Sequence, residues 1–536
     1  MLLAAPSAAA TPSATDITVT TTSDATNGDV RTVAGLIANP GPDGISLREA
    51  IEATNQDPGS YTIRFAPALA GATITQLWPP LTGGGVTVEG DINGDGKPDV
   101  TLRPGSESVG KTGFKISSSG NRLHALTLEG FVQGVLLQPD GNDKSVPSHR
   151  TFADNVVSDL VIRGFGNGIA LDSFQSPECN AFNRSPCPTY NRWTNTAFTG
   201  NTIDAGGFAF LIDPNASIGD RVEGLTVTGN TIRHDTSAAS ARGGAAIQLA
   251  QGGNSTQGRI SDVLIARNSI EGVNGDGGIF VASGLQRAQA NTIERVRILD
   301  NRIHLVKQGA VPCCYAIVLD AGSDTWALDT RPVNYPSDNV VRDVQIAGNS
   351  VSGSLAAGVR IQAGVDAGGS RNRVDNVRVE RNVIRSTMMG KGVYLWVGDI
   401  VPFEGTYATG NRITGVTIEA NRITTGKSKP LPGETDYRTA GGIVLLGGWH
   451  YGRRGVIRDV RITNNRIATA QAGIRLIGGL ESTARGNSVT CVRLAGNRIT
   501  GTRNVVVVTP NEGRPAHPGK PNEGGASGNR ATLGGC

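Results

Sequence analysis

Five side chains that can do carbohydrate chemistry occupy equivalent places in three successive copies of a short extended pattern. Asp320 ends AIVLD, Arg360 and Gln362 alternate with apolar residues in GVRIQA, and Tyr394 and Trp396 do so in GVYLWV. A carboxylate can transfer a proton or attack a glycosidic carbon. We therefore expect Asp320 to be the acid or nucleophile and Arg360 to hold or tune it. Tyr394 and Trp396 would be platforms for sugar rings, with Gln362 beside them.

A glycosidase needs a second carboxylate, about 5–5.5 Å from the first in retaining enzymes or about 6.5–9.5 Å in inverting ones. Asp172 also follows a Leu in an extended segment, but our alignment puts it four turns of the chain from Asp320, or about 19 Å. Those two cannot be partners. The remaining candidates lie in irregular segments after the strands, and the sequence does not choose among them: Asp324, Asp329, Asp366, Asp399 and Glu404.

Further substrate contacts are expected along the same surface. Beside Trp396, the candidates are an amide, two further aromatic side chains and a histidine: Gln248, Phe280, Trp326 and His450. A lyase chemistry is left open, because β-elimination next to a uronate carboxyl needs a base and cations. Arg360 could serve there, with Lys391, Arg453 and Arg454 nearby.

One segment has the ligand spacing of a calcium loop. Asp91, Asn93, Asp95 and Asp99 place side-chain oxygens at alternating positions, with glycines for a sharp turn, in the pattern DxNxDGxxD. Arg103 stands where a full loop of this kind has its bidentate Glu. The alternative is a polar hairpin turn built on Asn-Gly-Asp-Gly. We expect any bound calcium to be structural, and no cofactor for catalysis.

These residues are positioned by a repeat. Nine copies of one phrase, such as VTIEANRI and VRILDNRI, recur at intervals of 29 to 48 residues. Each has an Asn followed by one spacer residue and then Ile or Val: Asn201, Asn230, Asn268, Asn301, Asn349, Asn382, Asn421, Asn465 and Asn497. A fixed core with variable intervals indicates a solenoid. Each unit predicts three short strands, with the Asn at the tight corner between the second and the third. Stacked copies predict a hydrogen-bonded ladder of asparagines.

Side chains alternate across a strand, so the residues between the apolar core positions should face solvent on one sheet. In order, these outward pairs are Lys115/Ser117, Leu136/Gln138, Ala170/Asp172, an uncertain turn near Asp213, Gln248/Ala250, Phe280/Ala282, Val318/Asp320, Arg360/Gln362, Tyr394/Trp396, Val444/Leu446 and Arg475/Ile477. Long irregular segments flank them. We expect a walled groove suited to an extended polymer.

Two resemblances support this architecture. The segment Ser46-Leu47-Arg48-Glu49-Ala50-Ile51 resembles the CSLREA segment of bacterial surface and secreted β-helix proteins, with Ile45 in place of its Cys. Ser46 and Glu49 also form the spacing of a capping box, which predicts a short helix. The repeats resemble the right-handed parallel β-helix of the pectate-lyase-like superfold. The fold class expected is all-β: a right-handed parallel β-helix solenoid of about eleven rungs. Its divisions are a leader (1–15), an N-terminal cap containing a short α-helix (16–100), the β-helix (101–510) and a C-terminal tail (511–536).

Export fits the remaining features. MLLAAPSAAATPSA resembles the end of a secretory signal, and six cysteines suit an oxidising compartment. We expect disulfides Cys179–Cys187 and Cys491–Cys536, and leave adjacent Cys313 and Cys314 undecided between a vicinal disulfide and thiols. A net charge of +4, spread along the chain, is no nucleic-acid footprint. No segment is long enough to insert in a membrane.

The sequence thus predicts a secreted polysaccharide-degrading enzyme, a glycoside hydrolase before a lyase. Its partner would be a polysaccharide, and it would be a monomer or a homotrimer. A non-catalytic, adhesive glycan-binding solenoid on a surface is the alternative.

Overall fold

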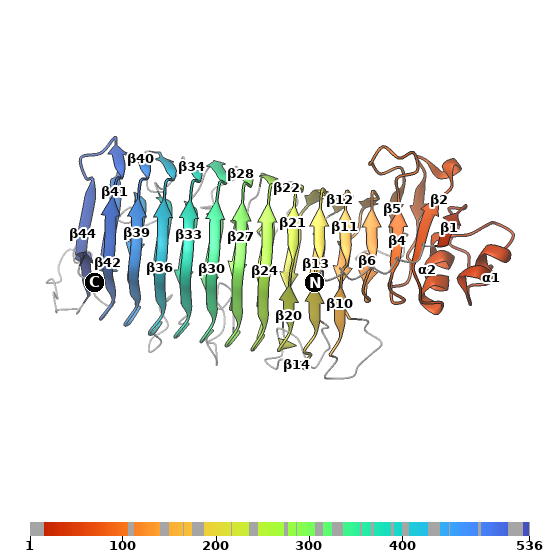
Figure 1. Ribbon diagram of the computed structural model, residues 1–536, viewed down its shortest axis with the longest axis horizontal. Helices are drawn as coiled ribbons and strands as arrows, with labels where there is room; N and C mark the ends of the chain where they lie inside the picture. Colours follow the sequence, from red (N-terminus) through yellow and green to blue (C-terminus); the bar gives the residue numbers. More distant parts are fainter. Residues whose placement is uncertain are drawn as a thin grey trace, which may run out of the picture.

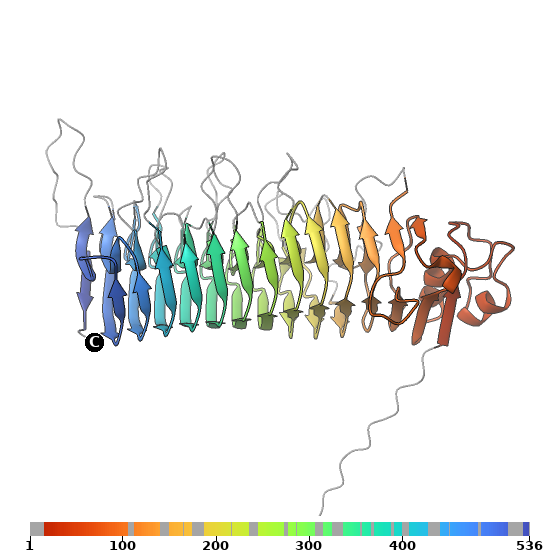
Figure 2. The same ribbon diagram turned by 90° about the horizontal axis from the view of Figure 1, so that it is seen from above.

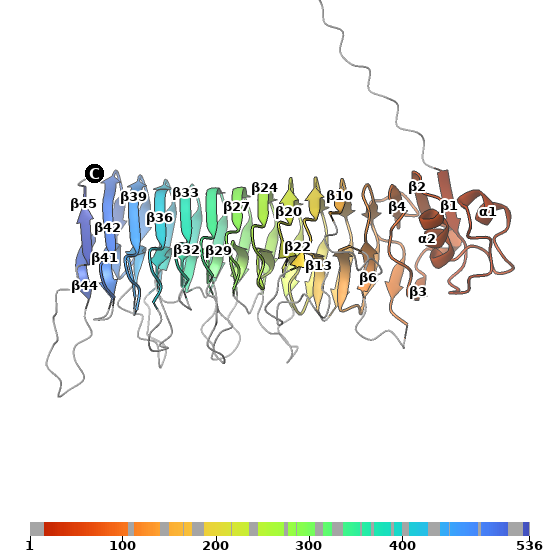
Figure 3. The ribbon, with the colours of Figure 1, turned by 90° about the horizontal axis from the view of Figure 1, so that it is seen from below.

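The chain forms a right-handed parallel β-helix, seen side-on in Figure 1. The computed structural model describes residues 15–105, 112–139, 149–164, 166–173, 187–215, 217–234, 245–272, 277–285, 287–305, 315–323, 336–353, 356–365, 369–386, 391–398, 407–426, 440–449, 451–480, 484–512, 529–534 and 536. Within this part of the chain, three parallel sheets run the length of the solenoid, and sheets A and C lie on opposite sides of it (Figure 3).

Sheet A contains, in chain order, β1 (Thr15–Val19), β2 (Tyr61–Phe65), β4 (Val86–Glu89), β7 (Arg122–His124), β10 (Thr151–Ala153), β11 (Val156–Ser158), β15 (Arg192–Thr194), β16 (Ala197–Thr199), β20 (Arg221–Glu223), β21 (Thr226–Thr228), β24 (Arg259–Ala266), β27 (Thr292–Leu299), β30 (Val340–Ala347), β33 (Arg373–Glu380), β36 (Arg412–Glu419), β39 (Val456–Thr463), β42 (Ser488–Ala495) and β45 (Arg530–Leu533). All of its pairs are parallel.

Sheet B contains short strands, and those from β17 onward follow the asparagine corner: β3 (Thr73–Thr75), β5 (Thr101–Arg103), β8 (Thr127–Glu129), β12 (Val161–Gly164), β17 (Thr202–Ala205), β22 (Thr231–His234), β25 (Ser269–Glu271), β28 (Arg302–Leu305), β31 (Ser350–Gly353), β34 (Val383–Ser386), β37 (Arg422–Thr425), β40 (Arg466–Ala468) and β43 (Arg498–Thr500).

Sheet C carries the predicted site: β6 (Thr112–Ile116), β9 (Gln133–Leu137), β13 (Asn167–Asp172), β18 (Phe210–Asp213), β23 (Ile247–Ala250), β26 (Gly277–Ala282), β29 (Tyr315–Ala321), β32 (Ala357–Ala363), β35 (Lys391–Val397), β38 (Gly441–Leu446), β41 (Ala472–Leu480) and β44 (Val506–Glu512). A small pair, β14 (Cys187–Pro188) and β19 (Ser217–Ile218), lies apart.

Alternation along each strand builds the core, as predicted. In β33, Val374, Val377 and Val379 point inward and are fully buried, while Arg373 and Arg378 between them are exposed. The same pattern repeats in every turn, so one apolar cluster runs through the middle of the stacked rungs. Burial of apolar surface, at about 25 cal/mol per Å², is therefore distributed along the axis rather than concentrated at one centre.

The predicted asparagine ladder is present at the corner between sheets A and B. Asn382 donates from Nδ2 to Oδ1 of Asn421 at 3.0 Å and to the Ile346 carbonyl at 2.8 Å, and it accepts from Asn349 at 2.9 Å. Its side chain is 1 % exposed. Each amide thus satisfies buried backbone groups of the turn before it and bonds the asparagine side chain of the turn after it.

A second ladder stands at the corner between sheets C and A, and our sequence analysis missed it. Asn339 donates to Asn372 at 3.0 Å, and Asn372 donates to Asn411 at 3.2 Å. The signal was in the chain, because each second-ladder Asn precedes a first-ladder Asn by ten residues, as Asn411 precedes Asn421. Gly or Asp replaces it in three turns, which obscures the repeat.

The ends of the solenoid are covered as the sequence suggested. The capping box is confirmed: α2 (Leu47–Gln56) begins after Ser46, which accepts from the Glu49 backbone. Glu49 is buried and accepts four hydrogen bonds, from Asn27 N and Gly28 N at 2.8 Å and from the backbone and hydroxyl of Ser46 at 2.9 Å. These contacts explain the Ser-Leu-Arg-Glu-Ala pattern structurally.

The N-terminal region has a second helix that was not expected, α1 (Val33–Ala38). Its strand β2 pairs with β4, and β4 pairs with β7. The parallel stack thus extends into the region expected to be a cap (Figure 2). At the other end, the predicted Cys491–Cys536 disulfide is confirmed and joins the last residue to β42. Cys179, Cys313, Cys314 and residues 1–14 lie outside the described residues. No helix in the described part of the chain is long and apolar enough to cross a membrane.

Candidate functional site

The register of the predicted catalytic strip on sheet C is as expected. Asp320 pairs with Gln362, which pairs with Trp396, while Arg360 pairs with Tyr394 on the next rung. All five side chains point away from the central core, since Leu319, Ile361 and Leu395 between them belong to it. The alternation argument therefore placed them on the correct face.

Their exposure differs from the prediction. Asp320 is fully buried, Tyr394 is 1 % exposed, Trp396 6 % and Arg360 7 %. Gln248 and Phe280, further along the strip, are also buried. The expectation that this strip faces solvent is wrong, because a second apolar cluster covers the outside of sheet C. That cluster contains Tyr394, Trp396, Val444, Leu446, Trp449 and Ile477.

The sequence of these strands already indicated burial on their outward side. Four of the outward positions on these rungs are Val318, Val444, Leu446 and Ile477, which are poor residues for a solvated face, and each is at most 1 % exposed. A strand that is apolar on both faces indicates burial on both faces. The strands that carry Asp320, Arg360 and Trp396 are therefore buried on both faces and are not amphipathic.

Inside this layer the polar groups are held by protein. Asp320 Oδ2 accepts from Gln362 Nε2 at 2.7 Å and from the Ser323 hydroxyl. The Arg360 guanidinium lies between two aromatic rings, 4.4 Å from the centroid of Tyr315 and 4.6 Å from that of Trp396. Cation–π contacts of this kind are strongest when desolvated. The ring of Trp396, which we expected to bind a sugar, is instead covered by Arg360.

The other predicted residues of this site fall outside the part of the chain that the structure describes. These are the second-acid candidates and the wall residues: Asp324, Asp329, Asp366, Asp399, Glu404, Trp326 and His450. Their assignment to the site stays a prediction, as does the catalytic role of Asp320.

A different pair of carboxylates is brought together further toward the N-terminus. Asp172 ends β13 and Asp213 ends β18, and the two are register partners on adjacent rungs. Neighbouring strands lie about 4.8 Å apart, so parallel side chains on register partners keep their carboxyl groups at a similar spacing. Asp172 is partly exposed, and Asp213 is 9 % exposed. The turn that contains Asp213 is the one whose outward residues the sequence left uncertain.

Polar contacts hold this pair in place. Asp213 Oδ1 accepts the Gly252 backbone N–H at 2.8 Å, and Asp172 Oδ1 accepts from Asn215 Nδ2 at 3.3 Å. Nearby Asp220 takes an Asn position of the second ladder. It is fully buried and accepts from Thr189 Oγ1 at 2.6 Å and from the Ser173 hydroxyl, which makes it a structural carboxylate.

The environment separates the two acids. Burial raises the pKa of Asp172 well above its usual range, and the negative charge of Asp213 raises it further. Burial raises the pKa of Asp213 to about 6, against the opposing effect of the Gly252 N–H. When two carboxylates interact in this way, one ionises first and the other keeps the proton. Both carboxyl groups therefore keep a proton to higher pH than an ordinary aspartate does.

The exclusion of an Asp172–Asp320 pair is confirmed by the strand pairing. The register passes from Asp213 on β18 through β23 and β26 to Asp320 on β29, so four rungs separate Asp172 from Asp320. The two regions of sheet C are therefore chemically independent.

In the predicted calcium loop, the aspartate side chains accept hydrogen bonds from backbone N–H groups of the same turn. Both carboxylate oxygens of Asp91 accept backbone N–H groups, from Gly94 at 2.7 Å and Gly96 at 2.8 Å, and these bonds lower its pKa, with Gly96 contributing most. Asp99 accepts from Asn93 N at 3.1 Å. This is the geometry that the polar-turn alternative expects. Calcium binding stays a prediction.

Comparison with protein-family models gave no match, and neither did comparison with curated protein sequences. Among solved structures, the chain is similar to the A-module of a mannuronan C-5 epimerase from Azotobacter vinelandii (11 % identity, covering 88 % of this chain and 95 % of that one, TM-score 0.36). It is also similar to an endo-xylogalacturonan hydrolase from Aspergillus tubingensis (11 %, 97 % and 99 %, 0.33) and to a surface adhesin of Streptococcus pneumoniae (10 %, 76 % and 83 %, 0.31). At these values the likeness is one of fold alone.

Proposed function

We propose that the chain is a secreted polysaccharide-degrading enzyme, a glycoside hydrolase whose catalytic pair is Asp172 and Asp213. One observation carries the proposal: two carboxylates stand in register on adjacent rungs, and burial raises the pKa of both, so that the pair can hold one proton while one of its carboxyl groups is ionised. Glycosidases need that combination of an acid and a nucleophile or base. The Cys491–Cys536 disulfide supports export, since disulfides persist in oxidising compartments.

In this mechanism Asp172 protonates the glycosidic oxygen of the leaving group. Its raised pKa keeps it protonated at mildly acidic pH, and its partial exposure allows contact with a glycan. Asp213 attacks the anomeric carbon as the carboxylate. The rung spacing of about 4.8 Å is close to the separation of about 5–5.5 Å found in retaining enzymes, so we expect retention of anomeric configuration.

The test uses three single variants and a screen of neutral and uronate-containing polysaccharides. Reducing ends are measured for hydrolysis, and ultraviolet absorbance is measured for the unsaturated products of a lyase. We expect Asp172→Asn and Asp213→Asn each to lose more than about a hundredfold of activity, the usual scale of general acid–base catalysis. Asp320→Asn should retain activity, because its carboxylate is buried among protein donors.

Each other outcome has a distinct meaning. Loss of activity in Asp320→Asn alone would return the centre to the strip that the sequence predicted. Absorbance that survives both Asp172 and Asp213 substitutions would favour a lyase. A folded protein that binds glycans and releases no product from any of them would favour the adhesive solenoid. Any of these three results contradicts the proposed pair.

A further inference from the structure

The outer face of sheet A carries a row of long polar side chains, one on each successive rung. Its members are register partners in sequence, here named the arginine row: Arg297, Gln345, Arg378, Thr417, Arg461 and Arg493. The four arginines are exposed, whereas the residues on either side of each along its strand are buried or only partly exposed. This face is opposite to sheet C and was not used by the proposed catalytic pair.

The arginines of this row have no ion-pair partner among the described residues. Other arginines on the same sheet do: Arg295 bonds Asp262 at 2.7 Å, and Arg342 bonds buried Glu294. The acids that line the hollows beside the row, Asp262, Asp343 and Asp459, are each paired with an arginine outside the row, and the arginine row keeps its positive charge. Charges left unpaired in a line create a field that attracts a counter-charged ligand.

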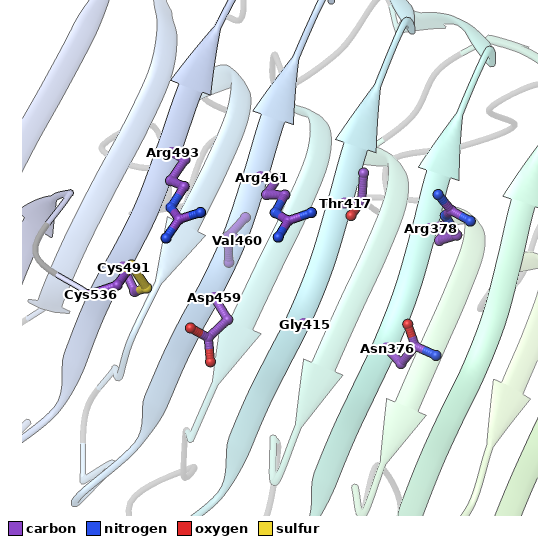
Figure 4. Close-up of a pocket in the computed structure, with 10 residues that line it drawn as sticks. All are labelled: Asn376, Arg378, Gly415, Thr417, Asp459, Val460, Arg461, Cys491, Arg493 and Cys536. Atoms are coloured by element: carbon purple, nitrogen blue, oxygen red, sulfur yellow. A yellow bond between two sulfur atoms is a disulfide. The ribbon is translucent and has the colours of Figure 1, made fainter.

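The row lies in hollows of the surface. One hollow of about 440 Å³ is lined by Arg378, Thr417, Arg461 and Arg493 and ends at the Cys491–Cys536 disulfide, as Figure 4 shows. A second, of about 420 Å³, is lined by Arg297, Gln345 and Arg378. Because Arg378 lines both, the two hollows adjoin and follow the axis of the solenoid.

Two neighbouring arginines of the row line the same hollow. Arg461 and Arg493 are direct register partners, and two like charges facing each other across neighbouring strands destabilise a sheet. A carboxylate bridging two guanidinium groups would remove that repulsion and accept forked hydrogen bonds from each. A ligand with one acid group on each repeating unit could do this along several rungs.

We propose that the arginine row is a binding surface for a linear anionic polysaccharide, which it holds through carboxylates along the polymer. No residue lining the two hollows is aromatic. Single-stranded nucleic acids are usually held by aromatic platforms in addition to basic grooves. The lining therefore fits a ligand held by charge through its acid groups rather than by stacking of its bases. Several weak contacts on one chain add up by multivalency.

The chain offers a matched control on sheet B. Arg422, Arg466 and Arg498 are likewise exposed, stacked as register partners on three successive rungs, and without an ion-pair partner in the described ranges. The test compares the triple variant R378Q/R461Q/R493Q with R422Q/R466Q/R498Q. Both remove three surface charges from the same part of the solenoid, so general charge and stability effects are equal between them.

Binding is measured to sodium polygalacturonate, with neutral dextran and single-stranded DNA as comparison probes, over a range of salt concentrations. We expect the sheet A variant to bind polygalacturonate at least about tenfold more weakly than the native chain, a difference of about 1.4 kcal/mol. The sheet B variant should bind as the native chain does. Binding should weaken with salt, because exposed charges are screened.

Three results would overturn the proposal. Equal losses in both variants would mean that only the overall charge matters. Dextran binding equal to that of polygalacturonate would remove the need for an acid group. DNA bound more tightly than polygalacturonate would assign the face to nucleic acid. Reducing-end release measured in parallel reports on the Asp172–Asp213 pair separately, so failure of one proposal leaves the other distinguishable.

Discussion

Replacing Asp213 by Asn should stabilise the folded chain at neutral pH while removing activity. The carboxyl of Asp213 has its pKa raised from 3.8 to about 6 by burial. Because the folded state then binds the proton more tightly than the unfolded state does, this group favours folding below pH 3.8. It loses that contribution as the pH rises to about 6. An amide carries no charge and keeps an oxygen to accept the Gly252 N–H.

The size of the gain follows from the two pKa values. Their difference corresponds to about 3 kcal/mol at pH 7, since one pKa unit is worth about 1.36 kcal/mol. The same relation gives about half of this at pH 5 and almost nothing at pH 3. Loss of the Asp213 charge also removes one cause of the raised pKa of Asp172, which adds to the gain in the same direction.

Urea unfolding at pH 7, 5 and 3 measures this, with the midpoints of native chain and variant compared at each pH. Asp300→Asn is the control, because Asp300 is exposed and lies at positive φ, where Asn is also accepted. We expect a gain for Asp213→Asn that shrinks as the pH falls, and none for the control. A variant less stable than the native chain at pH 7, or a gain that grows toward pH 3, would refute the reasoning.

Three further predictions concern the scaffold. Asn382→Ala should lower the free energy of unfolding by about 2–4 kcal/mol, because it leaves buried backbone groups without partners. Asn497→Ala, at the partly exposed end of the ladder, should lower the free energy of unfolding by less. Denaturant unfolding of both variants measures the difference. Glu49→Gln should loosen the N-terminal region, because it replaces one carboxylate oxygen and with it the acceptor of two of the four hydrogen bonds; we expect faster amide exchange there and unchanged exchange in β33. If the predicted loop binds calcium, calcium raises the thermal midpoint of the native chain and leaves that of Asp95→Ala unchanged; an equal rise in both would contradict the calcium prediction.

Catalysis should depend on pH in a bell shape. Asp213 must be ionised, so activity should rise as the pH passes about 6, and Asp172 must be protonated, so activity should fall above its own raised pKa. Initial rates over pH 4–9 on the responsive polysaccharide check this. A flat profile would contradict the assignment of the two acids.

The local pattern of the sequence was sufficient for the solenoid and for several of its details. A repeated Asn phrase predicts one ladder because each copy occupies the same corner, and the Ser46–Glu49 spacing predicts a helix start, since both depend on residues a few positions apart. The tail disulfide is predicted because Cys491 lies in the last repeats and can hold the tail that ends at Cys536. The second ladder was readable in principle from the ten-residue offset of Asn411 and Asn421.

The chemistry of the surface was decided by tertiary structure. The turns of the chain vary in length between 29 and 48 residues, so the sequence alone does not state which acids share a register. The pairing of β13 with β18 places Asp172 beside Asp213. Alternation tells which side of a strand a residue occupies and not whether that side is covered. Asp320 and Arg360 were placed on the correct face and are buried there, because burial depends on what packs over the sheet, and no local pattern records that.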